Sequence, residues 1–150
     1  MTTTLAAMFL AVTVGQAQTP AALMYDANVG PVAFAAGEVK TALTANHFSV
    51  TALPPGDPAL AKPSIRVIIT TEDARLPGQP ATTGLVNQGY SIQRIATPAA
   101  TNWWVIGKGA AGAMYGGLEL AEAVQLADGL SGVTNRQTNP YLQKRGIKFN

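Results

Sequence analysis

Residues Gly107–Gly112 read GKGAAG, a Gly-x-Gly-x-x-Gly pattern between an apolar run and a stretch of helical spacing. In dinucleotide-binding enzymes such a turn brings backbone N–H groups against a pyrophosphate at a helix N-terminus. That chemistry also needs a second parallel strand after the helix, ending in an acid about 20 residues on. The segment 128–135 (DGLSGVTN) supplies neither. We therefore interpret the glycines as a means of packing a helix closely on a sheet, with nucleotide binding as the alternative.

Side chains for acid–base, nucleophilic or metal chemistry are few. Glu72 and Asp73 are the only adjacent acids. Glycosidic cleavage needs two carboxylates about 5–10 Å apart across a pocket, and neighbours in a loop rarely supply that. His47 is the single histidine and there is no cysteine, so neither a metal site nor a thiolate nucleophile is expected. No catalytic residue, metal ligand or cofactor site is predicted.

Trp103 and Trp104 could recognise a sugar by stacking. Successive residues of a strand point to opposite faces, so we expect one indole in the core and at most one free for recognition. A stand-alone sugar-binding module that uses a tryptophan is therefore one functional hypothesis.

Composition indicates one globular domain of ordinary size. Of the 150 residues, 47% are hydrophobic and 12% are charged, which allows a sizeable core. The net charge is only +2 and the basic residues are scattered, so the dense basic face of a nucleic-acid binder is not expected.

The N-terminus resembles an export signal. The apolar run Leu5–Val14 is shorter than the roughly 20 residues that span a bilayer. Gly15 and Ala17 place small residues at the −3 and −1 positions of a cleavage site. We predict a signal peptide over residues 1–17, a mature chain that begins at Gln18 with no membrane span, and a secreted or periplasmic location.

Periodicity predicts seven elements in the order β-α-β-β-β-β-α. The expected strands are 22–26, 48–53, 64–70, 89–96 and 102–106, and the expected helices are 31–46 and 110–126. Ser64–Thr70 is the most apolar and β-branched run, so we place it centrally, and 89–96 with 102–106 should form an antiparallel hairpin. The fold class predicted is α+β, a mostly antiparallel sheet of four to five strands covered on one face by two helices.

The second helix carries an expected packing stripe of small residues. Its members recur at spacings of three and four, and side chains on the opposite side should be in water. The stripe consists of Ala110, Ala113, Met114, Gly117, Ala121 and Val124, and the expected wet residues are Tyr115, Glu119 and Glu122.

Three stretches, YSIQRI, WWVIGKGAAGAMYGGLELAEAV and PYLQKRGIKFN, carry a family resemblance. Together they resemble the N-terminal α/β domain that precedes the (β/α)8 barrel in β-N-acetylhexosaminidases and α-glucuronidases. The matching residues are Tyr90, Ile92, Ile106, Gly107, Gly112, Met114, Tyr115 and Gly116, with Arg145-Gly146 at the start of the barrel. Where hexosaminidases continue to an aspartate, this chain reads Ile147–Asn150, which favours a glucuronidase-type or uncharacterised relative.

The resemblance implies a division of the chain and a role. Residues 18–136 would form a hexosaminidase-like accessory domain, and 137–150 a linker and the start of the first barrel strand. The parent would be an exported glycoside hydrolase whose catalytic carboxylates lie in the barrel. Arg145 would contact substrate hydroxyls. The implied partners are the (β/α)8 barrel of the same polypeptide and a carbohydrate substrate.

Overall fold

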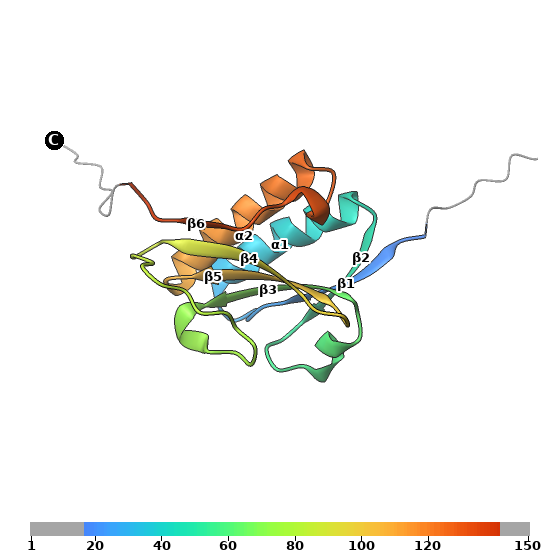
Figure 1. The fold of residues 1–150 in the computed structure, drawn as a ribbon, viewed down its shortest axis with the longest axis horizontal. Helices are drawn as coiled ribbons and strands as arrows, with labels where there is room; N and C mark the ends of the chain where they lie inside the picture. Colours follow the sequence, from blue (N-terminus) through green and yellow to red (C-terminus); the bar gives the residue numbers. More distant parts are fainter. Residues whose placement is uncertain (1–16, 142–150) are drawn as a thin grey trace, which may run out of the picture.

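Two helices lie side by side across one face of a six-stranded sheet (Figure 1). The structure is a computed structural model that describes residues 17–141. The strands are β1 (Thr19–Met24), β2 (Phe48–Leu53), β3 (Ile65–Thr71), β4 (Tyr90–Ala96), β5 (Thr101–Gly107) and β6 (Arg136–Thr138). The helices are α1 (Gly30–Ala45) and α2 (Gly109–Leu126), and the short 3-10 turns are η1 (Pro58–Ala61), η2 (Glu72–Ala74) and η3 (Leu130–Gly132).

The α+β class with two helices on one face is confirmed, and so is the antiparallel β4–β5 hairpin. The strand order is β2-β1-β3-β5-β4-β6, which places β3 centrally as predicted. The first strand lies at Thr19–Met24 rather than 22–26, and two features of the sheet also differ from the expectation. The sheet has six strands rather than four or five, and it is mixed rather than mostly antiparallel, because β1 pairs in parallel with β2 and β3, and β3 with β5.

Crossover connections explain the parallel pairs. A parallel pair requires a long connection, which α1 supplies between β1 and β2. The loop between β2 and β3 crosses the other face of the sheet, and this lets β3 run in the same direction on the far side of β1 (Figure 1). The strand β6 is three exposed polar residues at the sheet edge, so no alternation of polar and apolar residues marked it in the sequence.

The first helix follows its sequence pattern closely. Pro31 lies in its first turn, where a missing N–H costs nothing. The buried side is Val32, Ala35, Ala36, Val39, Ala42 and Leu43, a set with the spacing of one helix face. The helix ends at Ala45, and Asn46, the predicted stop, caps it: its side-chain amide donates to the carbonyl oxygen of Ala42 at 3.0 Å. This helix is therefore anchored on the sheet by small and β-branched side chains.

The face of the sheet without helices is also apolar. Met24, Ile68, Trp104 and Ile106 form a second buried cluster there. Leu60 and Leu76, from the two loops that cross this face, pack against the cluster. The loops thus act as a third layer beneath the sheet (Figure 1). Within residues 17–141, no helix is long and apolar enough to cross a membrane.

Candidate functional site

The glycine turn lies between β5 and α2, where strand and helix backbones touch. A Cβ atom built on Gly107 would lie 1.8 Å from the backbone nitrogen of Ala113. One built on Gly112 would lie 2.3 Å from the carbonyl oxygen of Gly89. That same oxygen accepts a hydrogen bond from the backbone N–H of Lys108 at 2.8 Å, so it cannot move away freely. The interpretation as packing residues is confirmed for Gly107 and Gly112, whereas Gly109 has nothing within 4 Å of a built Cβ and has a backbone φ of 76°.

The surroundings of the turn differ from those of a dinucleotide site. After α2 the chain forms β6, which pairs antiparallel with β4 at the sheet edge. A dinucleotide fold would return with a parallel strand whose acid reaches the ribose. Lys108, the charged residue of the turn, is paired with Glu72. The geometry does not support nucleotide binding at Gly107–Gly112.

Two further glycines bring α2 against its neighbours. A Cβ on Gly116 would lie 2.7 Å from Cγ1 of Val105 on β5, and one on Gly117 would lie 2.8 Å from Cβ of Ala35 on α1. Because α2 touches both the sheet and α1, its buried surface is wider than the predicted stripe. The stripe needs correction, since Ala110 and Met114 are only half-buried, and the buried set is Gly112, Ala113, Gly116, Gly117, Leu120, Ala121 and Val124.

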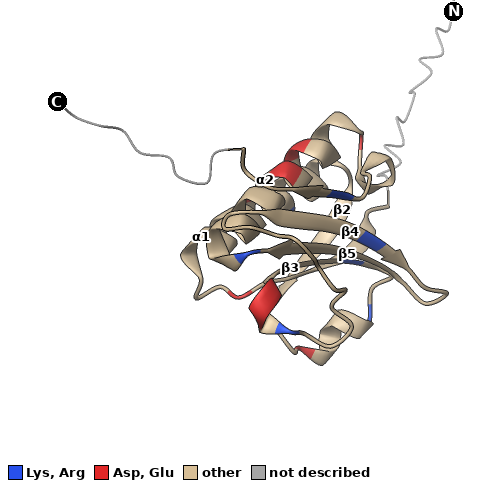
Figure 2. Cartoon of the chain, turned by 60° about the vertical axis from the view of Figure 1, so that its left-hand side comes forward, with Lys and Arg blue, Asp and Glu red and all other residues tan. Residues whose placement is uncertain are grey.

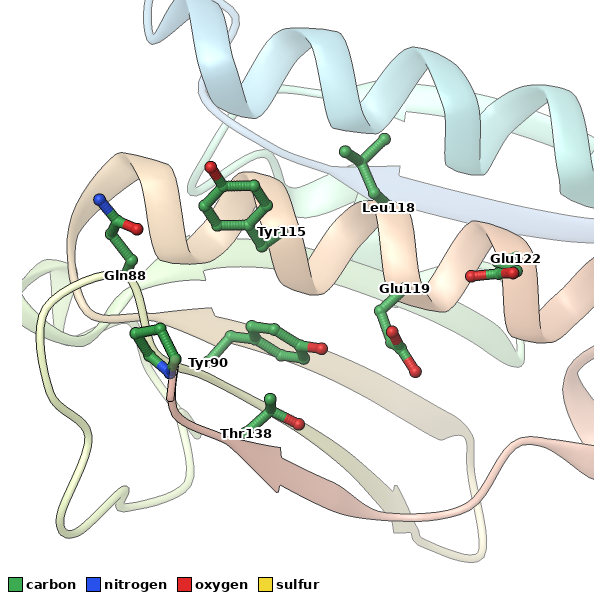
Figure 3. Close-up of a pocket in the computed structure, with 8 residues that line it drawn as sticks. Gln88, Tyr90, Tyr115, Leu118, Glu119, Glu122 and Thr138 are labelled. Carbon is green, nitrogen blue, oxygen red and sulfur yellow. The ribbon is translucent and has the colours of Figure 1, made fainter. Parts of the chain in front are cut away.

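A groove runs between α2 and the edge of the sheet (Figure 3). We call it the edge groove. Its volume is about 330 Å³. Tyr115, Leu118, Glu119 and Glu122 of α2 form one side, and Gln88, Tyr90, Thr138 and Pro140 the other. Tyr115 is 40% exposed, which agrees with its predicted position in water. The residues that line this groove combine aromatic rings with carboxylates.

The two carboxylates of the edge groove differ in exposure, and Glu122 is exposed, as expected. Glu119 was expected to be exposed, but it is half-buried and forms an ion pair with Arg136 of β6. Burial raises the pKa of the Tyr90 phenol, and the negative charge of Glu119 raises it further. Tyr90 is thus a neutral hydrogen-bonding group at neutral pH, and the ion pair attaches the short strand β6 to α2.

A second polar cluster lies where β3 and β5 end. Nζ of Lys108 is 2.5 Å from Oε2 of Glu72, and the Thr82 hydroxyl donates to Oε1 of Glu72 at 2.8 Å. These hydrogen bonds, that from Lys108 first, lower the pKa of the Glu72 carboxyl, and the same pairing raises the pKa of Lys108. A general acid needs a raised pKa. Glu72 therefore has the character of a loop anchor, and Asp73 beside it is exposed on η2.

The two tryptophans lie on opposite faces of β5, as predicted, but neither ring is free. Trp103 is 1% exposed and belongs to the core under the helices, with the Arg94 guanidinium 5.9 Å from its ring centroid. Trp104 is 4% exposed on the helix-free face. The expectation that one indole could stack on a sugar is wrong, because the loops beneath the sheet cover the second face as well.

The remaining predicted residues do not add to a site. His47 is exposed in the turn after α1 with a backbone φ of 63°. Among residues 17–141, no three His, Cys, Asp or Glu side chains are grouped as metal ligands. The basic residues are spread over separate elements (Figure 2). Arg145, the predicted substrate contact, lies outside the described residues, as do most of the predicted signal peptide and linker.

Comparisons with known proteins relate the fold of this chain to solved structures. No family model and no curated protein matches the chain. Among solved structures, the chain is similar to one described as a GH138 enzyme targeting pectin rhamnogalacturonan II, with a TM-score of 0.51 and 16% sequence identity. The match covers 80% of this chain and 12% of that chain. At this identity the likeness shows that the fold is shared with part of a glycoside hydrolase.

Proposed function

We propose that this chain is the non-catalytic N-terminal domain of an exported, carbohydrate-degrading glycoside hydrolase. In this proposal residues 1–17 direct export, residues 18–138, which end with β6, pack against a (β/α)8 catalytic barrel, and residues 139–150 lead into that barrel. The parent enzyme is of the α-glucuronidase or β-N-acetylhexosaminidase type. The domain shapes the cleft from outside and supplies no catalytic acid.

One observation carries this proposal. The fold recurs in a glycoside hydrolase of which it makes up a small part, 12% of that chain. The described residues also fit a supporting role, because the acid best placed for chemistry, Glu72, has a lowered pKa and holds a loop. The hydrogen bonds of Glu72 with Thr82 and Lys108 join the loop after β3 to the end of β5.

The edge groove is the surface we assign to the barrel. It lies beside Pro140, where the described chain leaves β6 toward the proposed linker. Tyr115 and Leu118 supply apolar area, and Glu119 and Glu122 supply charge for a polar rim. Phe34 of α1, 57% exposed, adds a further apolar side chain on the helical layer.

Activity measurements test whether catalysis belongs to the barrel and not to this domain. The 150-residue chain should hydrolyse no aryl glycoside, whereas the longer gene product should hydrolyse at least one of a panel that includes aryl glucuronides and aryl N-acetylglucosaminides. Hydrolysis by the 150-residue chain that is lost in Glu72→Gln would overturn the proposal. A stop codon immediately after codon 150 would also overturn it.

The docking surface has its own test in paired thermal melts. Tyr115→Ser should change the melting temperature of the 150-residue chain little, because the side chain is 40% exposed there. In the longer protein the same change should lower it by several degrees if the ring is covered by the barrel. Lys62→Ser, beside η1 on the opposite face of the sheet, is the control and should be neutral in both. Equal effects of Tyr115→Ser in both proteins would exclude the edge groove as the interface.

Arg145 is assigned a substrate contact in the same proposal. Arg145→Ala in the longer protein should raise KM more than it lowers kcat, because a contact to substrate hydroxyls present in the ground state is lost. Lys148→Ala, three residues on, is the matched removal of positive charge. A KM unchanged by Arg145→Ala would leave the arginine a purely structural role.

A further inference from the structure

The strand β2 forms one edge of the sheet, and among residues 17–141 it pairs only with β1. Ser49, Thr51 and Ala52 of this strand are exposed, so the described part of the chain does not cover them. The edge groove, which we assign to the barrel, lies at the other side of the sheet, next to β6. The β2 edge is therefore open, and it lies opposite the proposed barrel interface in the strand order.

The backbone groups that β2 leaves unpaired follow from its register with β1. The N–H of Thr19 donates to the carbonyl oxygen of His47 at 3.0 Å, and the N–H of Tyr25 donates to that of Leu53 at 3.1 Å. A strand in a parallel ladder directs the N–H and C=O of every second residue to the same neighbour. The odd-numbered residues of β2 therefore bond to β1. The residues whose N–H and C=O groups point away from β1 are Phe48, Val50 and Ala52.

The β2 edge carries none of the features that commonly protect a sheet edge. Natural edge strands are kept from further pairing by charged side chains, prolines, bulges or short length. The opposite edge has such protection, because β6 is three residues long and contains Arg136. By contrast, β2 is six residues long, reads FSVTAL without charge or proline, and keeps a continuous register with β1. It can therefore accept one more strand.

The alternation of β2 decides which side chains would meet across a new strand pair. Phe48 and Val50 pack against the core beneath the helices. Thr51 lines a cavity on the helix-free face. Ser49 shares that face with Thr51, because alternate residues of a strand point to the same side. One side of the edge is thus apolar, and the other side carries two hydroxyls.

A second copy of the same strand matches this edge. Antiparallel pairing about a twofold axis at Val50 sets Val50 against its own copy and Phe48 against Ala52 of the second copy. Every outward N–H and C=O of the two strands then has a partner, because antiparallel residues of this class exchange both hydrogen bonds. On the other face Ser49 meets Thr51 of the second copy, a favourable hydroxyl pair. Neither face of the pair brings like charges together.

We propose that two copies of this chain associate through antiparallel pairing of their β2 strands, which joins the two sheets into one. The twofold arrangement consumes the β2 edge of both copies, so association ends at the dimer. A strand pair of six residues is only about 20 Å long, which is a narrow contact beside those of stable dimers. We expect a dissociation constant on the order of 10–1,000 µM. The proposal does not depend on a downstream barrel.

Sedimentation velocity of the 150-residue chain, from about 5 µM to about 1 mM, tests this directly. The sedimentation coefficient should rise from that of a monomer to that of a dimer and no further. Amide hydrogen exchange over the same concentrations reports where the copies meet. Exchange at Val50 and Ala52 should become slower as the concentration rises, whereas the amides of β6 should not change.

Paired charges test the antiparallel register. Ser49→Lys combined with Thr51→Lys sets lysine against lysine across the axis, and should weaken the dimer by about tenfold or more. Ser49→Lys combined with Thr51→Glu sets opposite charges together in both pairs, and should return association to at least the parent level. Asn87→Lys combined with Gln125→Lys is the control, since it adds the same charge at exposed positions outside β2. All three should melt like the parent when dilute.

A proline substitution tests the backbone contact without adding charge. Ala52→Pro removes an N–H that points away from β1, a position where an edge strand tolerates proline. It should weaken the dimer by about tenfold or more while the dilute monomer stays folded, because each copy loses a donor to the other. Thr51→Pro is the matched comparison. It removes an N–H that bonds to β1, so it should lower the melting temperature of the monomer itself.

Specific results would overturn the proposal. A chain that stays monomeric at about 1 mM would do so, and the β2 edge would then serve a strand of another protein or none. A dimer that is equally tight in the parent, in the double-lysine variant and in Ala52→Pro would place the contact elsewhere. Opposite charges at 49 and 51 that associate no better than two lysines would exclude the antiparallel register. Species larger than a dimer would exclude the twofold arrangement.

Discussion

Gly112→Ala should destabilise the chain although alanine is the better helix former. The added Cβ would lie 2.3 Å from the carbonyl oxygen of Gly89, and that oxygen is held by the backbone N–H of Lys108. The clash between the new Cβ and this oxygen can therefore be relieved only if α2 shifts away from the start of β4. Overpacking of this kind costs about 1–3 kcal/mol in the free energy of unfolding.

Gly37→Ala is the matched comparison. Gly37 lies inside α1, is exposed, and has nothing within 4 Å of a built Cβ. The same substitution there should stabilise the fold by up to about 1 kcal/mol through helix propensity alone. At roughly 4 °C per kcal/mol for a domain of this size, Gly112→Ala should melt about 4–12 °C below the parent, and Gly37→Ala up to about 4 °C above it.

Differential scanning calorimetry of the 150-residue chain and the two variants measures both shifts. Gly117→Leu, with a built Cβ 2.8 Å from that of Ala35, should fall below the parent as well. The reasoning fails if Gly112→Ala melts at or above the parent while Gly37→Ala behaves as expected. Added NAD or ATP is a second control. A rise of several degrees in the parent at millimolar nucleotide would restore the nucleotide interpretation of the turn.

Two further predictions concern the polar cluster around Glu72 and the predicted signal peptide. Hydrogen bonds from Lys108 and Thr82 lower the pKa of Glu72 below its ordinary 4.5, so the ionised carboxylate stabilises the fold at neutral pH and this contribution is lost as the pH falls through the lowered pKa. Glu72→Gln should therefore melt below the parent at pH 7, and the difference in melting temperature should close in acid. Asp73→Asn is the control and should melt like the parent. A difference for Glu72→Gln that does not change with pH would contradict the assignment. For the leader, N-terminal sequencing of exported protein should begin at Gln18, and intact Met1 in that fraction would count against cleavage.

Much of the element pattern could be predicted because it depends on local chemistry. The strand β2 has the predicted bounds, and the apolar run that became β3 lies in the middle of the sheet. The direction of pairing could not be derived in the same way. It depends on which face the loop between β2 and β3 crosses, and a Pro-rich loop carries no periodic signal of that path.

The burial of Trp104 and the edge groove were missed for a related reason. Trp104 is buried because Leu60 and Leu76, from the two loops beneath the sheet, pack against its cluster. Those two leucines were the available signal. The edge groove depends on β6, whose three polar residues gave no strand pattern, so the position of Glu119 against Arg136 could not be foreseen.

The parallel centre of the sheet also sets an order of events during synthesis. The strand β3 pairs with β5, beginning with Ile65 against Thr101. The edge of β3 that faces β5 therefore stays unpaired until roughly 36 more residues have left the ribosome. At about 5–20 residues per second this interval lasts about 2–7 s. Throughout it the most apolar strand presents an open hydrogen-bonding edge, which is a template for association with other chains. The nascent chain therefore has a defined window in which chaperone binding at β3 would matter most for yield.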